Sequence, residues 1–437
     1  MVFSKLILAY NNHNLYINMN TVIALVALAI GLSSISSLAA GLAWLLIGVS
    51  GIVAGFKLRG SAIPIATWDD SRNVAAHAAQ GWLLACLTAL LLMLIPTAFW
   101  SGPWGERHPQ WRLLFGALGV WLLLLSSVPT GRILRVLASA VAISTVLAYG
   151  LVVTLSSTAA PTNRIPWMAG LSLFSITLLT LSYGLKDASL TLRRLWLSSS
   201  AIVLVTALLS GVRGSWPLLL IWPFALLGMH KSEPLLWRST WRWLLPWMVL
   251  LFTAGLFLIP EQDNPLLRIW DVITETGIYG ADNAVQNDSS SGIRLILYRC
   301  GLAHVMDHPW LGTGPAEAKQ LISQALAASG VMDDSIVMGH FHNDPLNPWV
   351  EFGVFGLMGY WTYAIGALWV AFRLKKALAD STFFMGLLAL VLMHTATGMS
   401  NMNFAHNYYP TMFSISMALI LCAVPVARRS GAPQLSN

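Results

Sequence analysis

The sequence predicts an all-α integral membrane protein with about twelve transmembrane helices and one large, mostly helical external loop. Three observations support this fold class. Of the 437 residues, 56% are hydrophobic and 10% are charged, and the mean hydropathy of +0.67 lies far outside the range of soluble globular domains. Apolar runs of membrane-spanning length recur along the chain. Lysine and arginine gather in alternate segments between those runs.

A membrane helix needs roughly 20 mostly apolar residues to cross a hydrocarbon core of about 30 Å. Few polar residues separate the first two candidate runs, so the alternative to two spans there is one long helix plus an interfacial helix. The first twenty residues carry no small-residue cleavage site, and we expect them to be retained. The predicted spans are 20–36, 37–57, 75–98, 110–128, 133–156, 165–183, 194–210, 215–230, 241–260, 348–372, 382–398 and 409–427.

The placement of positive charge orients these spans, because short cytoplasmic loops retain lysine and arginine. With both termini in the cytoplasm, seventeen of the 25 basic residues fall inside and eight fall outside. The net charge of +7 then follows from membrane orientation and requires no nucleic-acid partner. The eight outside are Arg107, Arg112, Arg164, Arg213, Arg268, Arg294, Arg299 and Lys319.

One segment between spans is long, and it holds eleven of the eighteen acidic residues. Ser289 to Ser291 and the apolar spacing after them predict a helix that Pro309 stops. A second amphipathic helix is predicted over 316–328. We expect this loop to fold over the outer ends of the spans. The predicted divisions are 1–260 for spans one to nine, 261–347 for the loop domain and 348–437 for spans ten to twelve.

Arg213 lies in a very short external turn, "SGVRGSW", between two apolar runs. A lone interfacial arginine usually extends to lipid headgroups. Here Gly211 and Gly214 allow close backbone approach, and the short turn leaves the side chain little freedom. We therefore expect the Arg213 guanidinium group to be held in place, where it can bind an anion.

Two arginines on the predicted loop helix are further candidates. Arg294 faces either solvent and nearby acids or, with Tyr298 one turn away, the membrane spans. Arg299 points in a different direction and is the alternative to Arg294 as the anion ligand.

The stretch "GHFHNDPLNPWVEFG" gathers polar chemistry just before an apolar run. His340 and His342 alternate across Phe341, so in an extended segment both imidazoles project to one side. An HxH pair alone is weak evidence for a metal, since a third ligand would have to come from Asp344 or Glu351. A histidine near its ordinary pKa of about 6.5 suits a general base or a hydroxyl partner, and we expect that role for His342.

Other polar residues around these histidines suit a carbohydrate ligand. Asn343 is placed to hold a neighbouring side chain or a sugar hydroxyl. Glu351 lies about one turn into an apolar span, where a carboxylate is costly unless it pairs with a cation or belongs to the site. The last external loop, "TATGMSNMNFAHNYYP", adds His406 and Asn407 in a mix that suits sugar surfaces and also interfacial aromatic belts.

The cysteines indicate no cofactor or disulfide framework. Cys86, Cys300 and Cys422 lack the CxxC or Cys/His spacing that would hold zinc or iron. We predict neither a metal nor a cofactor.

Together these segments resemble the O-antigen ligase and polymerase superfamily of bacterial envelope glycosyltransferases. The resemblance covers residues 200–375 and rests on the "SGVRGSW" turn, "SGIRLILYRCGLAHVMDHPWLGTGP" and "HFHNDPLNPWVEFGVFGLMGYW". It implies transfer of a glycan from undecaprenyl diphosphate to a hydroxyl at the periplasmic face of the inner membrane. In that family, the positions matching Arg213 and Arg294 are thought to hold the diphosphate, and the one matching His342 is the base.

The resemblance sets the expected partners and site. The partners are an undecaprenyl-diphosphate-linked O-antigen donor, a lipid A-core acceptor and membrane lipids, with no nucleotide sugar. Attack on the anomeric carbon in line with the leaving group would invert its configuration. From the resemblance together with the residues considered one by one above, the predicted substrate-binding residues are Arg213, Arg294, His340, Asn343, Arg299, Glu351, His406 and Asn407.

Several readings stay open at this point. The single folded loop near the end favours ligase over repeat-unit polymerase, and the short tail after the last span disfavours a protein O-oligosaccharyltransferase. A transporter or flippase for lipid-linked sugars predicts charges or broken helices near the bilayer midplane and an internal repeat, neither of which the sequence indicates. A structural scaffold leaves the concentration of Arg213, Arg294 and His342 unexplained.

Overall fold

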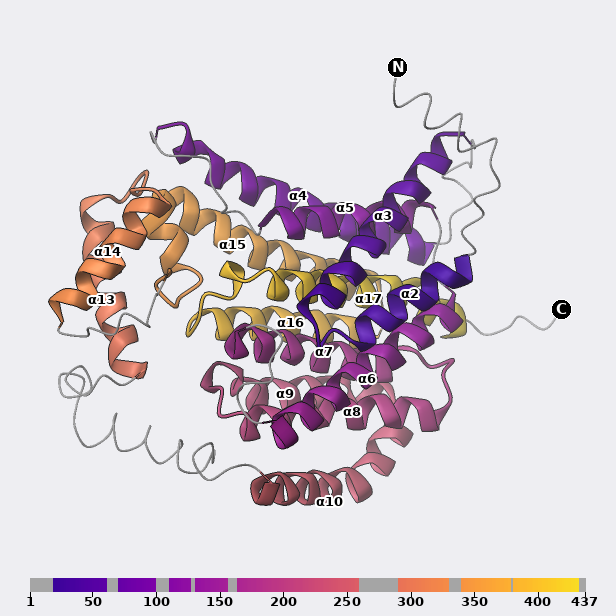
Figure 1. Cartoon of the computed structure of the whole chain (residues 1–437). Helices are drawn as coiled ribbons and strands as arrows, with labels where there is room; N and C mark the ends of the chain where they lie inside the picture. Colours follow the sequence, from indigo (N-terminus) through magenta and orange to yellow (C-terminus); the bar gives the residue numbers. More distant parts are fainter. Residues whose placement is uncertain are drawn as a thin grey trace.

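The computed structural model describes residues 19–60, 70–99, 110–126, 130–155, 163–258, 290–329, 339–378 and 380–431. These residues form an all-α structure without a strand (Figure 1). The α-helices are α2 (Met19–Gly31), α3 (Ser37–Gly60), α4 (Asp70–Thr97), α5 (Gln110–Ser126), α6 (Gly131–Leu155), α7 (Arg164–Gly184), α8 (Leu190–Leu209), α9 (Leu218–Met229), α10 (Pro234–Leu258), α13 (Ser290–Asp307), α14 (Pro315–Ala328), α15 (Leu346–Ala377), α16 (Thr382–Gly398) and α17 (Tyr408–Gly431). Short 3-10 turns are η3 (Arg213–Ser215), η4 (His230–Ser232) and η6 (Asn403–Ala405).

Within this part of the chain, seven helices are long and apolar enough to cross a membrane: α3, α4, α6, α7, α8, α15 and α17. Helices α2, α5, α10 and α16 contain shorter apolar stretches. Each of the twelve predicted spans coincides with a helix, and α2 and α3 are separate helices joined by a turn. Helix α9 has only 12 residues, with Pro223 inside it. The all-α membrane architecture is confirmed, and the number twelve stays a prediction.

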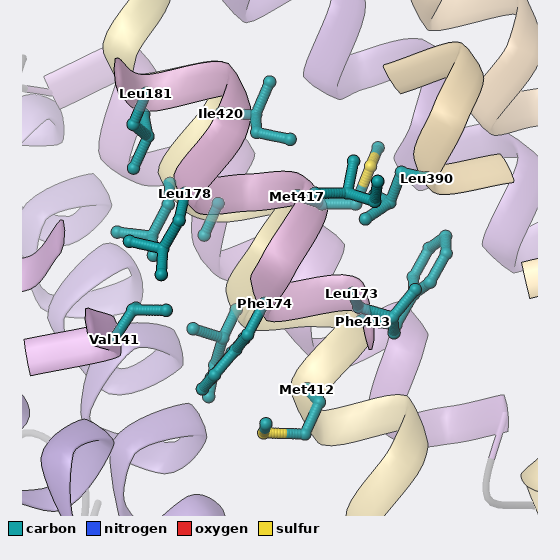
Figure 2. Packing of buried hydrophobic residues seen from close by; sticks show 14 of the residues in the cluster. Val141, Leu173, Phe174, Leu178, Leu181, Leu390, Met412, Phe413, Met417 and Ile420 are labelled. Carbon is teal, nitrogen blue, oxygen red and sulfur yellow. The ribbon is translucent and has the colours of Figure 1, made fainter. Parts of the chain in front are cut away.

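Helices α7 and α17 form the centre of the bundle. Every residue from Pro166 to Gly184 is buried, and most of α17 is enclosed as well. Figure 2 shows apolar side chains of these two helices meeting one another and those of α6 and α16. The labelled residues are Leu173, Phe174, Leu178 and Leu181 of α7, Met412, Phe413, Met417 and Ile420 of α17, Val141 of α6 and Leu390 of α16.

Hydroxyl groups inside α7 are satisfied within the bundle. Thr177 and Thr180 each donate a 2.8 Å hydrogen bond to the carbonyl four residues earlier. Ser175 donates to the carbonyl of Ser200 at 2.8 Å, and Ser200 donates back to the carbonyl of Ser175 at 2.7 Å. Unpaired polar groups are costly at membrane depth, and small residues let helices approach closely, so this pairing fits α7 tightly against α8.

Ion pairs join the helix termini at one end of the bundle. Lys186 Nζ lies 3.1 Å from Asp380 Oδ2, and Arg193 lies 3.4 Å from Glu233 Oε2. Both basic residues belong to the set that the sequence predicts to be cytoplasmic. At the opposite end of the bundle, the loop between α16 and α17 meets the end of α8 and the start of α15.

Helices α13 and α14 lie across that opposite end of the bundle (Figure 1). Their bounds agree with the two helices predicted in the external loop. A second hydrophobic cluster joins them to the first turns of α15; it contains Ile293, Ile296, Leu297, Val305, Ala318, Ile322, Leu326, Phe341, Leu346 and Val350. Residues 261–289 and 330–338 of the predicted loop lie outside the described residues, and the three-part division of the chain stays a prediction.

Helix α15 is broken at Gly353, where the backbone adopts φ 63° and ψ −152°. The span that the sequence predicts over 348–372 coincides with this helix, but the break near its start was not predicted. Residues 309–314 supply hydrogen-bond partners for the backbone groups that the break leaves unpaired. The Val354 N–H donates to the Pro309 carbonyl at 2.8 Å, and the Gly314 N–H donates to the Glu351 carbonyl at 2.9 Å. Because buried backbone groups need partners, these bonds fasten the segment after α13 to α15.

Candidate active site

Arg213 opens the short η3 turn between α8 and α9. Gly211 reverses the chain with φ 63°, a backbone conformation that residues other than glycine rarely adopt. The Ser215 hydroxyl donates to the Val212 carbonyl at 2.7 Å and holds the turn closed. A Cβ on Gly214 would lie 3.2 Å from Ser400 Oγ, so the turn packs closely against the loop after α16. Arg213 is half-buried on a turn that has little room to move.

Arg294 and Tyr298 project from the same face of α13, one turn apart. Burial lowers the pKa of Arg294, the Tyr298 hydroxyl group acts in the opposite direction, and the charge of Arg213 lowers it further. The two guanidinium groups are therefore close enough to interact electrostatically. Two neighbouring cations in a partly buried setting form a strong site for an anion.

His340 and His342 lie on the segment that leads into α15. Their rings are 4.3 Å apart between centroids, while Phe341 between them is fully buried, so the predicted projection of both imidazoles to one side is confirmed. Among the described residues other than glycine, His342 alone has a positive φ, 52°. The Tyr298 hydroxyl donates to the His342 carbonyl at 2.9 Å. Such strained backbone is maintained by its surroundings and is common at functional sites.

The loop between α16 and α17 completes the cluster. The Met399 carbonyl accepts hydrogen bonds from the Tyr298 hydroxyl at 3.2 Å and from Asn343 Nδ2 at 3.0 Å. The His406 ring lies 5.9 Å from the His340 ring in an edge-on arrangement. Segments about one hundred residues apart in the sequence thus form one polar site at the end of the bundle.

The environment keeps the three imidazoles neutral. Burial lowers the pKa of His342 to about 4; the charge of Arg294 and nearby His406 act in the same direction, and a hydrogen bond with Asn401 opposes them. Burial, with help from His342, His406 and Arg294, lowers the pKa of His340 to about 3. Burial also lowers the pKa of His406. At neutral pH each ring therefore keeps a lone pair that can accept a proton or a hydrogen bond.

Comparison with known proteins finds a family model that matches part of the chain. Residues 198–361 match the family model described as O-antigen ligase. This match covers less than half of the chain and supports membership of the O-antigen ligase and polymerase superfamily. The matched region contains Arg213, Arg294 and His342, whereas His406 lies beyond it. No curated protein matches the chain.

Other predicted residues lie at the margin of the cluster. Arg299 is exposed on α13, whereas Arg294 is half-buried and is the arginine whose charge lowers the pKa of His342. Asn407 is exposed, and its carbonyl accepts from the Thr411 hydroxyl at 2.8 Å. Glu351 is half-buried in α15 just before the break, where its backbone bonds to Gly314.

Sequence reasoning assigned no individual role in the candidate site to Tyr298, Asn401 or Asp344. Tyr298 was noted only as a neighbour of Arg294, and its two carbonyl acceptors are far away in sequence. Asp344 was considered only as a metal ligand. Within the described ranges, no three His, Cys, Asp or Glu side chains are placed to share a metal ion. Asp344 instead is buried and bonds to backbone.

Asp344 joins the two loops that carry the histidines. Its backbone N–H donates to the Gly398 carbonyl at 2.7 Å, and its Oδ1 accepts from the Phe404 N–H at 3.1 Å. Burial raises the pKa of this carboxyl well above its ordinary value, which favours the neutral form, although backbone hydrogen bonds oppose the shift.

We expect Asp344→Asn to preserve the fold, because a neutral amide oxygen can still accept from Phe404. Asp344→Ala removes the acceptor of a buried N–H and is expected to destabilise the protein by about 1–3 kcal/mol. The measurement is the thermal unfolding midpoint of the two purified variants beside the unmodified protein. Equal midpoints for the alanine and asparagine variants would contradict the role of this side chain.

Proposed function

We propose that this protein is an O-antigen ligase of the bacterial inner membrane. It transfers the O-antigen glycan from undecaprenyl diphosphate to a sugar hydroxyl of lipid A-core, on the periplasmic face, in lipopolysaccharide biosynthesis. The observation that carries the proposal is that Arg213 and Arg294 interact electrostatically and that Arg294 also acts on the neutral imidazole of His342, within the region that matches the family model.

The chemistry follows from these charges. The acceptor hydroxyl attacks the anomeric carbon, the bond from that carbon to the diphosphate oxygen breaks, and the electron pair leaves with undecaprenyl diphosphate. The two guanidinium groups bind the diphosphate and stabilise the negative charge that grows on it. His342 accepts the proton of the hydroxyl or aligns it, since its low pKa keeps the ring unprotonated. This scheme inverts the anomeric configuration and needs no divalent metal.

The remaining polar groups support recognition of the sugars. His340, His406 and Asn343 surround the same site, and neutral imidazoles and amides can donate to or accept from hydroxyl groups. The alternative of a transporter for lipid-linked sugars predicts a broken helix near the bilayer midplane. The break in α15 lies close to its first residues instead, where it positions the site.

The reaction can be tested with purified protein, a polyprenyl-diphosphate glycan and lipid A-core, without nucleotide sugar and with a chelator. We expect the joined glycolipid to form and undecaprenyl diphosphate to be released. Incubation with the donor alone separates ligase from polymerase, because only a polymerase lengthens the glycan there. Product that requires added divalent metal, or no product at all, would overturn the proposed reaction.

Separate substitutions of the two arginines test how the leaving group is held. We expect Arg213→Ala and Arg294→Ala each to lower the transfer rate by about 10²–10³-fold, the usual cost of removing one donor to a developing charge. Lysine at either position keeps the charge but loses the bidentate geometry, so partial activity is expected. The measurement is the initial rate of glycolipid formation at saturating donor.

Arg299→Ala provides the comparison on the same helix. Because Arg299 is exposed, we expect its removal to leave most of the rate intact. If Arg299→Ala instead lost the rate and Arg294→Ala kept it, the assignment of Arg294 to the diphosphate would be wrong.

A further inference from the structure

A groove lies on the bundle surface at the end away from the candidate active site. It has a volume of about 590 Å³ and runs between α2 and α6, with Leu192 of α8 beside it. This volume falls within the range of pockets that bind small molecules, about 300–1,000 Å³. The walls are apolar, and Leu28 and Ile143 on them are 59% and 56% exposed.

One end of the groove is cationic. Arg132 and Arg135, at the start of α6, belong to its lining. Arg132 is exposed, while Arg135 lies 2.6 Å from Asp187 Oδ2. Two guanidinium groups and one carboxylate leave a net positive charge at this end. An apolar wall with a cation at one end matches the layout of an anionic lipid.

The length of the groove matches one leaflet. From Arg132 to Ile143 the helix rises about 16 Å, at about 1.5 Å per residue. This is about half of a hydrocarbon core of about 30 Å. A chain that starts at the arginines and follows the groove therefore ends near the bilayer midplane.

We propose that this groove binds one anionic phospholipid, with its phosphate at Arg132 and Arg135 and an acyl chain along Leu28, Val136 and Ile143. The glycan donor is a poor occupant, because the groove that contains Arg132 also contains Leu192 in the first turn of α8, while Arg213 lies four residues after the end of α8. The 20 residues of α8 separate these points by about 30 Å. One diphosphate group cannot reach both ends. The site is thus independent of the proposed glycan transfer.

The test counts the lipids that the purified protein retains. The protein is placed in mixed micelles with equal phosphatidylglycerol and phosphatidylcholine, and native mass spectrometry measures the bound copies. We expect one retained phosphatidylglycerol and about fivefold weaker retention in Arg132→Gln, the usual effect of one basic residue near an anionic lipid. Ile143→Trp is expected to weaken retention too, because it fills the groove from an exposed position.

Arg238→Gln is the matched control, since Arg238 is also exposed but lies on α10 away from the groove. It should retain phosphatidylglycerol as the unmodified protein does. Equal retention of both lipids, or unchanged retention in Arg132→Gln, would overturn the proposal. Displacement of the lipid by inorganic phosphate alone would also overturn it, because the arginines would then form an ion site that does not use the groove.

Discussion

Replacing His342 with alanine is expected to lower the rate of glycan transfer by about 10²–10⁴-fold, the usual contribution of a positioned general base. Arg294 interacts electrostatically with His342, and the His342 ring is neutral because burial and this charge hold its pKa near 4. Alanine removes the proton acceptor but leaves both cations in place. Donor binding should therefore change little while turnover falls, which separate measurements of donor affinity and maximal rate can show.

His308→Ala is the matched control for this substitution. His308 is an exposed histidine just after α13, near the same end of the bundle. We expect its removal to leave the transfer rate and the amount of inserted protein unchanged. If His342→Ala kept full activity with normal accumulation, the imidazole would not be the base and the chemical assignment would fail.

The same argument fixes the sign of the pH dependence. The reaction needs neutral His342, so kcat/KM should stay level from neutral pH downward and fall only as the pH approaches about 4. The positive charge of Arg294 is one cause of the low pKa. In Arg294→Gln, the residual activity should therefore begin to fall at a higher pH than in the unmodified protein. A fall centred near the pKa of an exposed histidine in both proteins would contradict this electrostatic coupling.

Local signals in the sequence were sufficient to predict the bounds of the two helices of the external loop. Serine at the start and Pro309 after the end predicted α13, and the structure begins it at Ser290 and ends it at Asp307. The predicted second helix differs from α14 by one residue at its start. Hydropathy located a helix at each predicted span, because segments that cross a membrane must satisfy their own backbone.

Local sequence signals could not predict which residues contact one another within the candidate site. The hydrogen bond from Tyr298 to Met399 joins residues 101 positions apart, and no local pattern specifies that pairing. The choice between Arg294 and Arg299 likewise depended on which face of α13 meets η3 and the histidines. Sequence reasoning proposed both arginines for the candidate site, whereas burial and charge in three dimensions separate the inner Arg294 from the exposed Arg299.

The break in α15 was missed because a single glycine inside an apolar run is usually tolerated in a helix. Gly353 differs because its φ of 63° and ψ of −152° lie in a region that is essentially restricted to glycine. An added Cβ would also overlap the backbone of Trp310, where the segment after α13 crosses. The segment after α13 can therefore pack against α15 only because residue 353 has no side chain, and we call this contact the junction. It holds α13, which bears Arg294, close to the segment that bears His342.

Gly353→Ala is accordingly expected to destabilise the protein by about 3 kcal/mol or more, from backbone strain together with loss of buried hydrogen bonds such as Val354 to Pro309. The thermal unfolding midpoint of purified protein measures this effect. Gly150→Ala is the matched control: Gly150 lies inside α6, and a Cβ there would meet nothing within 4 Å. That substitution should be neutral or slightly stabilising, since alanine favours helix by about 1 kcal/mol. If both variants unfolded at the same temperature, the break would not require glycine, and the junction would not be what holds α13 against α15.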